Sequence, residues 1–146
     1  MEWGKYTWFL FHTLAEKIKS DEFVNYKNLI IKIIVGICSC LPCPVCTKHA
    51  GEYLKIYPIY SVKNKEDLKR YIFIFHNTIN KKKNKEIQNP KILEMYKKGN
   101  LPAIITIFNQ KFKTNAPNLM TEQMFRKNKL NEINLLLRNN FHIFEK

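Results

Sequence analysis

Apolar positions that recur at helical spacing predict the first two segments of the chain. In residues 4–19 and again in residues 25–37, apolar side chains return every three or four positions, as on one face of an α-helix. These positions are Trp8, Phe11, Leu14, Ala15 and Ile18 in the first segment, and Leu29, Ile30, Ile33, Ile34 and Ile37 in the second. The isoleucine-rich second segment also suits a buried strand, and its periodicity alone does not decide between strand and helix.

Three further helices are predicted from residues that favour helix ends. Pro44 suits the first helical position, where no N–H is needed, and a helix follows over residues 44–56. Asn64 is a candidate N-cap for a fourth helix, and a short fifth helix over residues 90–98 is closed by Gly99. The buried face of the fourth helix is expected at Leu68, Tyr71, Ile72, Phe75 and Ile79.

The pattern changes after Gly99. The run over residues 101–108 is predicted to be extended, and residues 121–141 are predicted to form a helix with a polar face. We therefore expect one main domain over residues 1–99 and a C-terminal extension of unknown role over residues 100–146.

Composition is that of an ordinary globular protein with a strong basic excess. The chain has 146 residues, 45% of them hydrophobic, and a formal charge of +13 from 25 basic and 12 acidic residues. Lysine, asparagine and isoleucine are common throughout, as an AT-rich coding sequence produces, and the basic residues do not gather on one stripe. We therefore expect no nucleic-acid partner. No apolar run reaches the roughly 20 residues of a membrane span, and the N-terminus lacks a signal-peptide pattern, so we expect neither a membrane partner nor a secretory leader.

All four cysteines fall within residues 38–46, which indicates chemistry or metal binding. A disulfide-stapled scaffold spreads its cysteines because stabilisation comes from closing long loops. Cys43 lies at a predicted helix N-terminus and Cys46 lies one turn further along. The exposed N–H groups and the helix dipole favour a thiolate there, so this pair suits a reversible disulfide with Cys43 accessible and Cys46 shielded.

Two other classes of protein use such cysteines. A zinc-binding interaction module commonly holds its metal with two separated pairs of ligands, whereas these four thiols are contiguous. A thioredoxin-like exchange protein needs a strand before the Cys-x-x-Cys helix, for which residues 29–37 are a candidate, and a later proline before a strand, for which Pro102 is a candidate. At this point both alternatives stay open.

Polar and aromatic residues share faces with the predicted apolar helices. His49 and Tyr53 follow Cys46 at i+3 and i+7, and Trp8 and His12 are one turn apart. His76 and Asn80 repeat this spacing on the fourth helix, with Asn77 beside His76. Each has an ordinary structural explanation, but together, on helices that carry a redox pair, they suit a flat, heteroatom-rich aromatic cofactor.

Three ordered motifs make the chain similar to the Erv/ALR family of flavin-dependent sulfhydryl oxidases, and most similar to its viral members. The first motif is Trp3-Gly4 followed by Trp8 and His12. The second is Cys-x-x-Cys-x-x-His-Ala over residues 43–50, and the third is His-Asn-x-x-Asn over residues 76–80 with basic residues behind it. The resemblance covers about residues 3–98.

The resemblance implies an all-α protein, a four-helix bundle with a short fifth helix, which binds FAD and usually forms a homodimer. The residues implied to line the flavin are Gly4, Trp8, His12, Cys46, His49, Tyr53, His76, Asn77 and Asn80, with Lys83 and Lys85 near the phosphates. Cys43 and Cys46 would be catalytic, and no metal site is implied. Cys38 and Cys40 have no family role that we can assign, and we favour buried bystanders over a relay.

The implied reaction takes electrons from a dithiol protein substrate, or from a thioredoxin-like relay protein, through Cys43 and Cys46 to FAD. Molecular oxygen then accepts the electrons and becomes hydrogen peroxide. The expected location is the cytoplasm, at a viral assembly site or in the virion for a viral protein, with the mitochondrial intermembrane space as the alternative.

Overall fold

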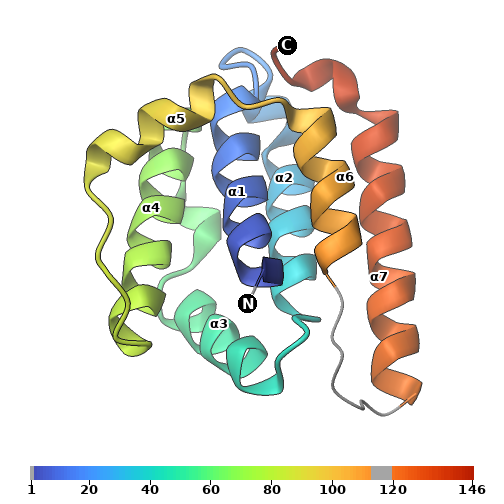
Figure 1. Ribbon diagram of the computed structural model, residues 1–146. Helices are drawn as coiled ribbons and strands as arrows, with labels where there is room; N and C mark the ends of the chain where they lie inside the picture. Colours follow the sequence, from blue (N-terminus) through green and yellow to red (C-terminus); the bar gives the residue numbers. More distant parts are fainter. Residues whose placement is uncertain (1, 113–119) are drawn as a thin grey trace.

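The computed structural model describes residues 2–112 and 120–146, and within these ranges the chain is helical with no strand. The helices are α1 (Glu2–Lys17), α2 (Phe23–Cys38), α3 (Pro44–Ile56), α4 (Lys65–Lys82), α5 (Leu93–Lys97), α6 (Leu101–Lys111) and α7 (Met120–Asn139). Short 3-10 turns occur at Ile59–Ser61, Pro90–Ile92 and Phe141–Ile143. The expected all-α fold, with four main helices and a short fifth, is confirmed (Figure 1).

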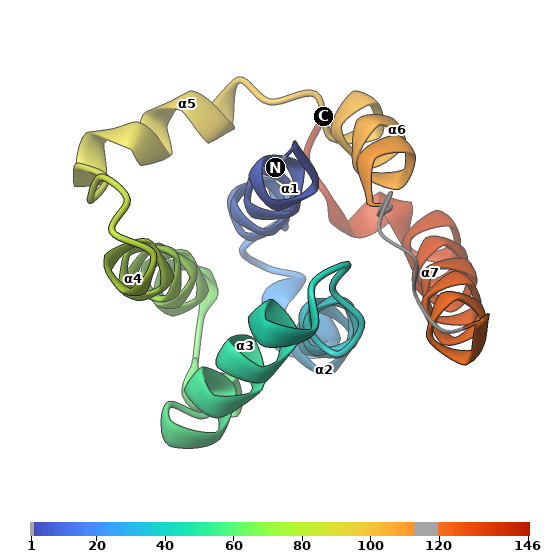
Figure 2. The same ribbon diagram turned by 60° about the horizontal axis from the view of Figure 1, so that its bottom comes forward.

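Helix α1 lies at the centre of the molecule. Seen from the end of the bundle, α2, α4, α5 and α6 surround it (Figure 2). The apolar side chains on its inner face, such as Leu14, are buried in the core. Its polar end is tied to α4, where Lys69 Nζ lies 3.0 Å from Glu16 Oε2 with both side chains largely buried. This ion pair holds α1 beside α4, with polar side chains of the two helices facing each other.

Residues 25–37, which also suited a strand, form most of α2. Ile30, Ile33, Ile34 and Ile37 are completely buried, since positions i, i+3, i+4 and i+7 fall on the face that packs into the bundle. Packing of this face overrides the strand preference of β-branched residues. The thioredoxin-like alternative required a strand here and is therefore excluded.

The prediction of an extended segment over residues 101–108 is wrong, because these residues lie in α6. Asn100 caps this helix, its Oδ1 accepting a hydrogen bond from the Ala103 N–H at 3.0 Å, and Pro102 occupies the first turn. Leu101, Phe108 and Phe112 are buried, with α6 packed against α1. A short isoleucine-rich run satisfies both periodicities, and the capping residues decide for the helix.

The helix predicted over residues 121–141 is confirmed as α7, which packs along α2. Ile133 and Leu137 are buried in the contact. The two helices approach closely at Gly36, where an added Cβ would lie 3.4 Å from Ile133 Cδ1 and 3.5 Å from Lys129 Cδ. The chain then returns to α1, with the Glu145 N–H donating to the Lys17 carbonyl at 2.7 Å. Both α6 and α7 are thus packed on the bundle.

Candidate active site

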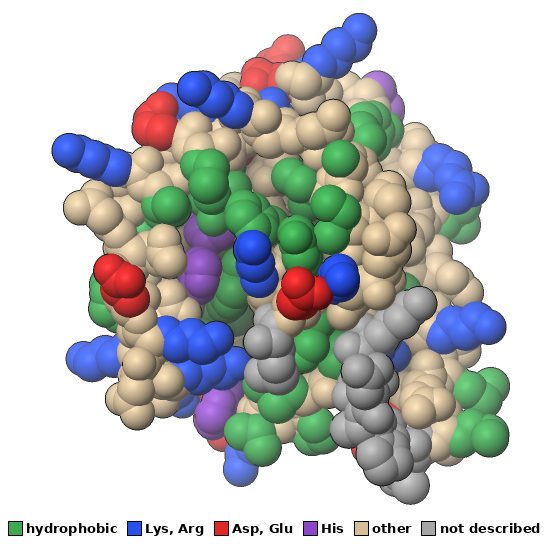
Figure 3. Space-filling model, viewed as in Figure 1, with side chains coloured by type: hydrophobic (Ala, Val, Ile, Leu, Met, Phe, Trp, Pro, Cys, Tyr) green, Lys and Arg blue, Asp and Glu red, His purple; other side chains and the backbone are tan. Residues whose placement is uncertain are grey.

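A cavity of about 420 Å³ opens between α1, α3, α4 and the segment that leads into α5. Figure 3 shows histidine side chains set in this hollow among apolar and lysine side chains. Eight of the residues that the sequence singled out line the cavity: Gly4, Trp8, Cys46, His49, His76, Asn80, Lys83 and Lys85. They come from three helices and one loop that are separated in sequence, so the fold brings them together.

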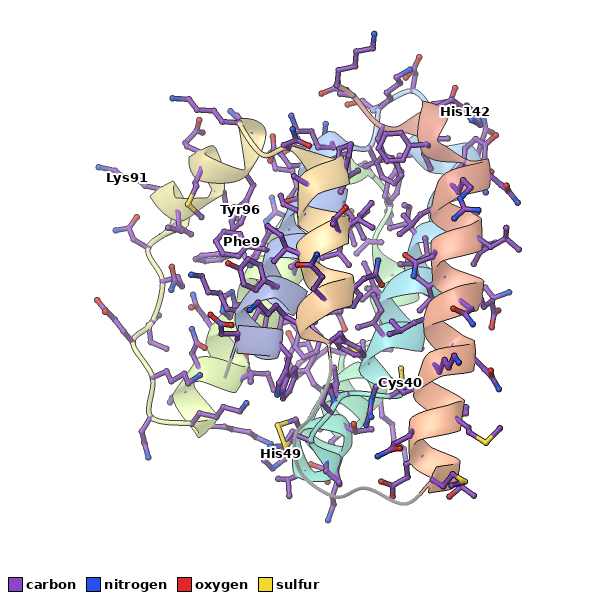
Figure 4. All side chains as sticks on the ribbon, turned by 45° about the vertical axis from the view of Figure 1, so that its right-hand side comes forward. Phe9, Cys40, His49, Lys91, Tyr96 and His142 are labelled. Carbon is purple, nitrogen blue, oxygen red and sulfur yellow. A yellow bond between two sulfur atoms is a disulfide. The ribbon has the colours of Figure 1, made fainter. Side chains whose placement is uncertain are left out.

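The redox pair lies at the start of α3. Cys43 is the N-cap, its Sγ accepting a hydrogen bond from the Cys46 N–H at 3.2 Å, and Pro44 follows at the first helical position. A disulfide joins Cys43 and Cys46, whose Cα atoms are 5.2 Å apart. Cys46 is 9% exposed and forms part of the cavity wall, whereas Cys43 is only half-buried. Figure 4 shows the disulfide beside His49. One sulphur is thus open to a substrate and the other faces the cavity.

Lys83 contacts the inner sulphur of this pair. Its Nζ donates a hydrogen bond to Cys46 Sγ at 3.6 Å. Burial lowers the pKa of Lys83, and the nearby charge of Lys85 lowers it further. The ammonium is therefore held in a site that lacks a full shell of water, next to the atom on which negative charge would appear when the disulfide opens.

Two pairs of stacked rings lie at the side of the cavity contributed by α1, α4 and α5, with Trp8, His76 and Tyr96 in the wall and His12 behind it. Trp8 stacks on His76 with ring centres 4.2 Å apart, and His12 stacks on Tyr96 at 4.5 Å. His12 Nε2 and His76 Nδ1 lie 2.9 Å apart, so one imidazole donates a hydrogen bond to the other and links the two stacks. Trp8 also meets Phe75 edge-on. The result is a rigid aromatic surface with polar edges.

Burial keeps both imidazoles neutral. It lowers the pKa of His12 to about 3, with the neighbouring His76 adding to the effect, and lowers the pKa of His76 to about 4, with Lys85 adding. Around neutral pH the pair therefore carries no charge, and its hydrogen bond joins a neutral donor to a neutral acceptor.

Acid should therefore destabilise the protein in a defined window. Because the folded-state pKa of His12 lies below its unfolded value, the unfolded chain binds more protons, and the free energy of unfolding falls as pH drops below about 6.5. The expected loss from His12 alone between pH 6.5 and 4.5 is about 2 kcal/mol. Urea unfolding across this range measures it. His12→Gln should flatten the curve and His142→Gln, at an exposed position, should not; equal slopes in wild type and His12→Gln would contradict the assignment.

Two asparagines of α4 hold the segment that leaves this helix. Asn77 Nδ2 donates to the Gln88 carbonyl at 3.1 Å, and its Oδ1 accepts from the Gln88 N–H at 2.8 Å. Asn80 Nδ2 donates to the Glu86 carbonyl at 3.1 Å, and its backbone carbonyl accepts from the Lys85 N–H at 2.8 Å. These bonds bring Lys85 to the cavity.

Three residues of the expected set lie behind the cavity wall. His12 reaches it through His76, Asn77 is occupied by Gln88, and Tyr53 stacks on Phe75 with ring centres 4.4 Å apart. In this geometry they support lining residues from behind.

The cavity wall also includes residues that sequence reasoning missed. They include Trp3, Lys5, Leu41, Gln88, Met95 and Tyr96. Trp3 belonged to the first motif but was given no role. Tyr96 lies on a helix that the sequence did predict, but nothing in the local spacing shows that its ring turns toward His12.

The other two thiols are free and buried. Burial raises the pKa of Cys38 to about 12 and that of Cys40 to about 11. Both are therefore protonated near neutral pH and are poor nucleophiles there. Within residues 2–112 and 120–146, no group of three or more His, Cys, Asp or Glu side chains is arranged to hold a metal ion.

Comparison with known proteins identifies the family of this chain. The model of the Erv1 / Alr family matches residues 5–98. FAD-linked sulfhydryl oxidases from two isolates of African swine fever virus are each 33% identical over 87 residues, which cover 60% of this chain and 72% of the viral protein. No solved structure matches the chain significantly. The fold and site define a helical thiol oxidase with a redox-active disulfide. The chain belongs to the Erv1 / Alr family.

Proposed function

We propose that this chain is an FAD-dependent sulfhydryl oxidase that forms disulfides in dithiol protein substrates and passes the electrons to oxygen. The observation that carries the proposal is the position of the Cys43–Cys46 disulfide, with Cys46 in the wall of an aromatic cavity and Cys43 nearer the surface. Family membership and the viral relatives support the same activity.

The cavity has the chemistry that an isoalloxazine ring requires. Trp8 and His76 offer a flat aromatic wall, while Asn80 and His49 supply polar atoms at its edges. His49 Nδ1 is buried and has no hydrogen-bond partner within the described residues, as expected of a group whose partner is a ligand. Lys85, at an exposed position on the rim, is suited to the phosphates. We assign these residues, with Gly4 and Cys46, as the FAD contacts, and His12, Tyr53 and Asn77 as their supports.

The first half of the reaction takes place on the chain's own cysteines. A substrate thiolate attacks Cys43 Sγ, a bond forms between these two sulphurs, and Cys46 leaves as a thiolate. The substrate's second thiol, as thiolate, then attacks its own bonded sulphur and releases Cys43, so that the substrate becomes a disulfide and the enzyme a dithiol. Bound FAD would supply the acceptor for the two electrons of this dithiol, with oxygen as the final acceptor and hydrogen peroxide as the product.

The surroundings of Cys46 favour its departure. The Lys83 ammonium donates to its sulphur, and the positive end of α3 lies at the same place. A thiolate leaves faster when the pKa of its thiol is lower. Attack at Cys43, which releases Cys46, is therefore favoured over attack at Cys46, which would release Cys43.

The wider setting is proposed from the relatives. We propose a homodimer, as is usual in the family, and a cytoplasmic site of action at viral assembly or in the virion, which the viral relatives favour. A thioredoxin-like relay protein is the second candidate donor of electrons. None of the described helices is both long and apolar enough to cross a membrane.

Purified protein tests the proposal. We expect a yellow protein with about one FAD per chain that consumes oxygen on addition of dithiothreitol and releases an equal amount of peroxide. Oxygen consumption recorded with an electrode, together with a peroxide assay, gives the stoichiometry. A folded, colourless protein that consumes no oxygen after incubation with FAD would rule out the proposed function.

A further inference from the structure

One charged side chain of α7 is buried where an apolar residue would be expected. The inward face of this helix consists of residues 126, 130, 133 and 137, of which Leu130, Ile133 and Leu137 are apolar. The remaining position is Arg126, which is only 9% exposed. A buried guanidinium is costly unless it is hydrogen-bonded, so its partners explain its presence.

Those partners are backbone carbonyls of the loop that carries the redox pair. Arg126 Nε donates to the Cys40 carbonyl at 2.9 Å, and a terminal nitrogen donates to the Leu41 carbonyl at 3.2 Å. Both carbonyls follow the end of α2, where helix carbonyls lack partners and the dipole favours a cation. Figure 4 shows Cys40 at this point, between the end of α2 and α7.

The loop is held from its other side by α3. The Thr47 hydroxyl donates to the same Leu41 carbonyl at 3.4 Å, and the Leu41 side chain lines the cavity. Pro42 follows, buried and with its φ fixed by its ring, and the next residue is Cys43. A shift of the Leu41 carbonyl is therefore transmitted to Cys43 with little room for adjustment.

We infer that Arg126 is a positioning residue of the oxidase: by fixing the Cys40 and Leu41 carbonyls it holds the Cys43–Cys46 disulfide at the cavity. The inference rests on the proposed function. It gives the segment after residue 98, which the family model does not match, an indirect part in the active site, through the loop that carries the redox pair. Helix α7 is anchored close enough for this, since it packs on α2 at Gly36.

The test uses the full-length protein with its flavin and two readouts. The first is hydrogen exchange, which we expect to be about tenfold faster in residues 39–47 of Arg126→Met and unchanged in residues 65–82. The second is turnover of dithiothreitol per bound FAD, for which kcat should fall about tenfold while KM changes by less than about twofold. Arg138→Met, an exposed change on the same helix, should leave both readouts at wild-type values.

Each outcome decides the inference. Unchanged exchange in residues 39–47 would show that Arg126 does not hold the loop, and faster exchange with unchanged kcat would show that the loop need not be held. If Arg126→Met fails to fold, Arg126→Lys is judged by the same two readouts. If wild type binds no FAD, the proposed function fails, and the rate at which dithiothreitol reduces the disulfide replaces kcat, with the same tenfold decrease expected.

Discussion

Cys46→Ser is expected to lower oxygen consumption with dithiothreitol by at least about a thousandfold, and Cys43→Ser to do the same. Either change removes the disulfide that substrate must attack, and a serine hydroxyl can neither form the mixed disulfide nor leave as a thiolate. Both variants should keep the FAD content of wild type, because the aromatic wall, with Trp8 and His76, is intact.

Cys40→Ser is the matched control. This thiol is also buried and only three residues before Cys43, yet its sulphur donates to the backbone carbonyls of Gly36 and Ile37 in α2. The turnover of Cys40→Ser with dithiothreitol should stay within about threefold of wild type. Substantial turnover in Cys43→Ser or Cys46→Ser, or loss of turnover in Cys40→Ser, would contradict the assignment of the redox pair.

Lys83→Met is expected to raise the pKa of the Cys46 thiol by about 1 to 3 units, because an opposite charge within a few ångströms stabilises a thiolate by this amount. The change is measured in a Cys43→Ser background, where Cys46 is a free thiol, as the pH dependence of its alkylation by iodoacetamide. Mass spectrometry locates the label. Cys38 and Cys40 interfere little because burial raises their pKa values to about 12 and 11.

Two further variants test whether the positive charge of Lys83 causes the shift in the pKa of Cys46. Lys83→Arg keeps the positive charge and should restore most of the reactivity. Lys82→Met removes an adjacent lysine that is exposed and lies 4.0 Å from Glu52, so the pKa of Cys46 should not move. A shift of less than about 0.3 unit in Lys83→Met, or an equal shift in Lys82→Met, would show that the contact between Lys83 and Cys46 has no chemical role.

Local pattern predicted most of the helices because burial on one face leaves a periodic trace. Asn64, for example, was identified as an N-cap, and its Oδ1 does accept the Asp67 N–H at 2.8 Å. Residues 101–108 were misassigned because an isoleucine-rich run of that length fits both strand and helix. Asn100 and Pro102 distinguish the two, because an N-cap residue followed by a proline in the first turn indicates the start of a helix.

Site residues could be identified from the sequence only where they belong to short motifs. Trp8, His12, His76 and the cysteines stood out by spacing, although their stacking and the hydrogen bond between the imidazoles are products of tertiary packing. Arg126 could not be found in this way, since its partners lie about 85 residues earlier in the chain. The division of the chain into two parts near Gly99 stays a prediction. The two helices that follow Gly99, α6 and α7, pack against α1 and α2, which precede it.

The contact between the Cys46 sulphur and the flavin is tested most directly by the visible spectrum of Cys43→Ser. In this variant Cys46 is free, and its thiolate should donate charge to the isoalloxazine, giving broad absorbance at wavelengths beyond the flavin's own bands that disappears on acidification. Cys46→Ser should show the flavin bands alone. A yellow Cys43→Ser protein without this absorbance at any pH, or its persistence in Cys46→Ser, would contradict a site in which Cys46 faces FAD.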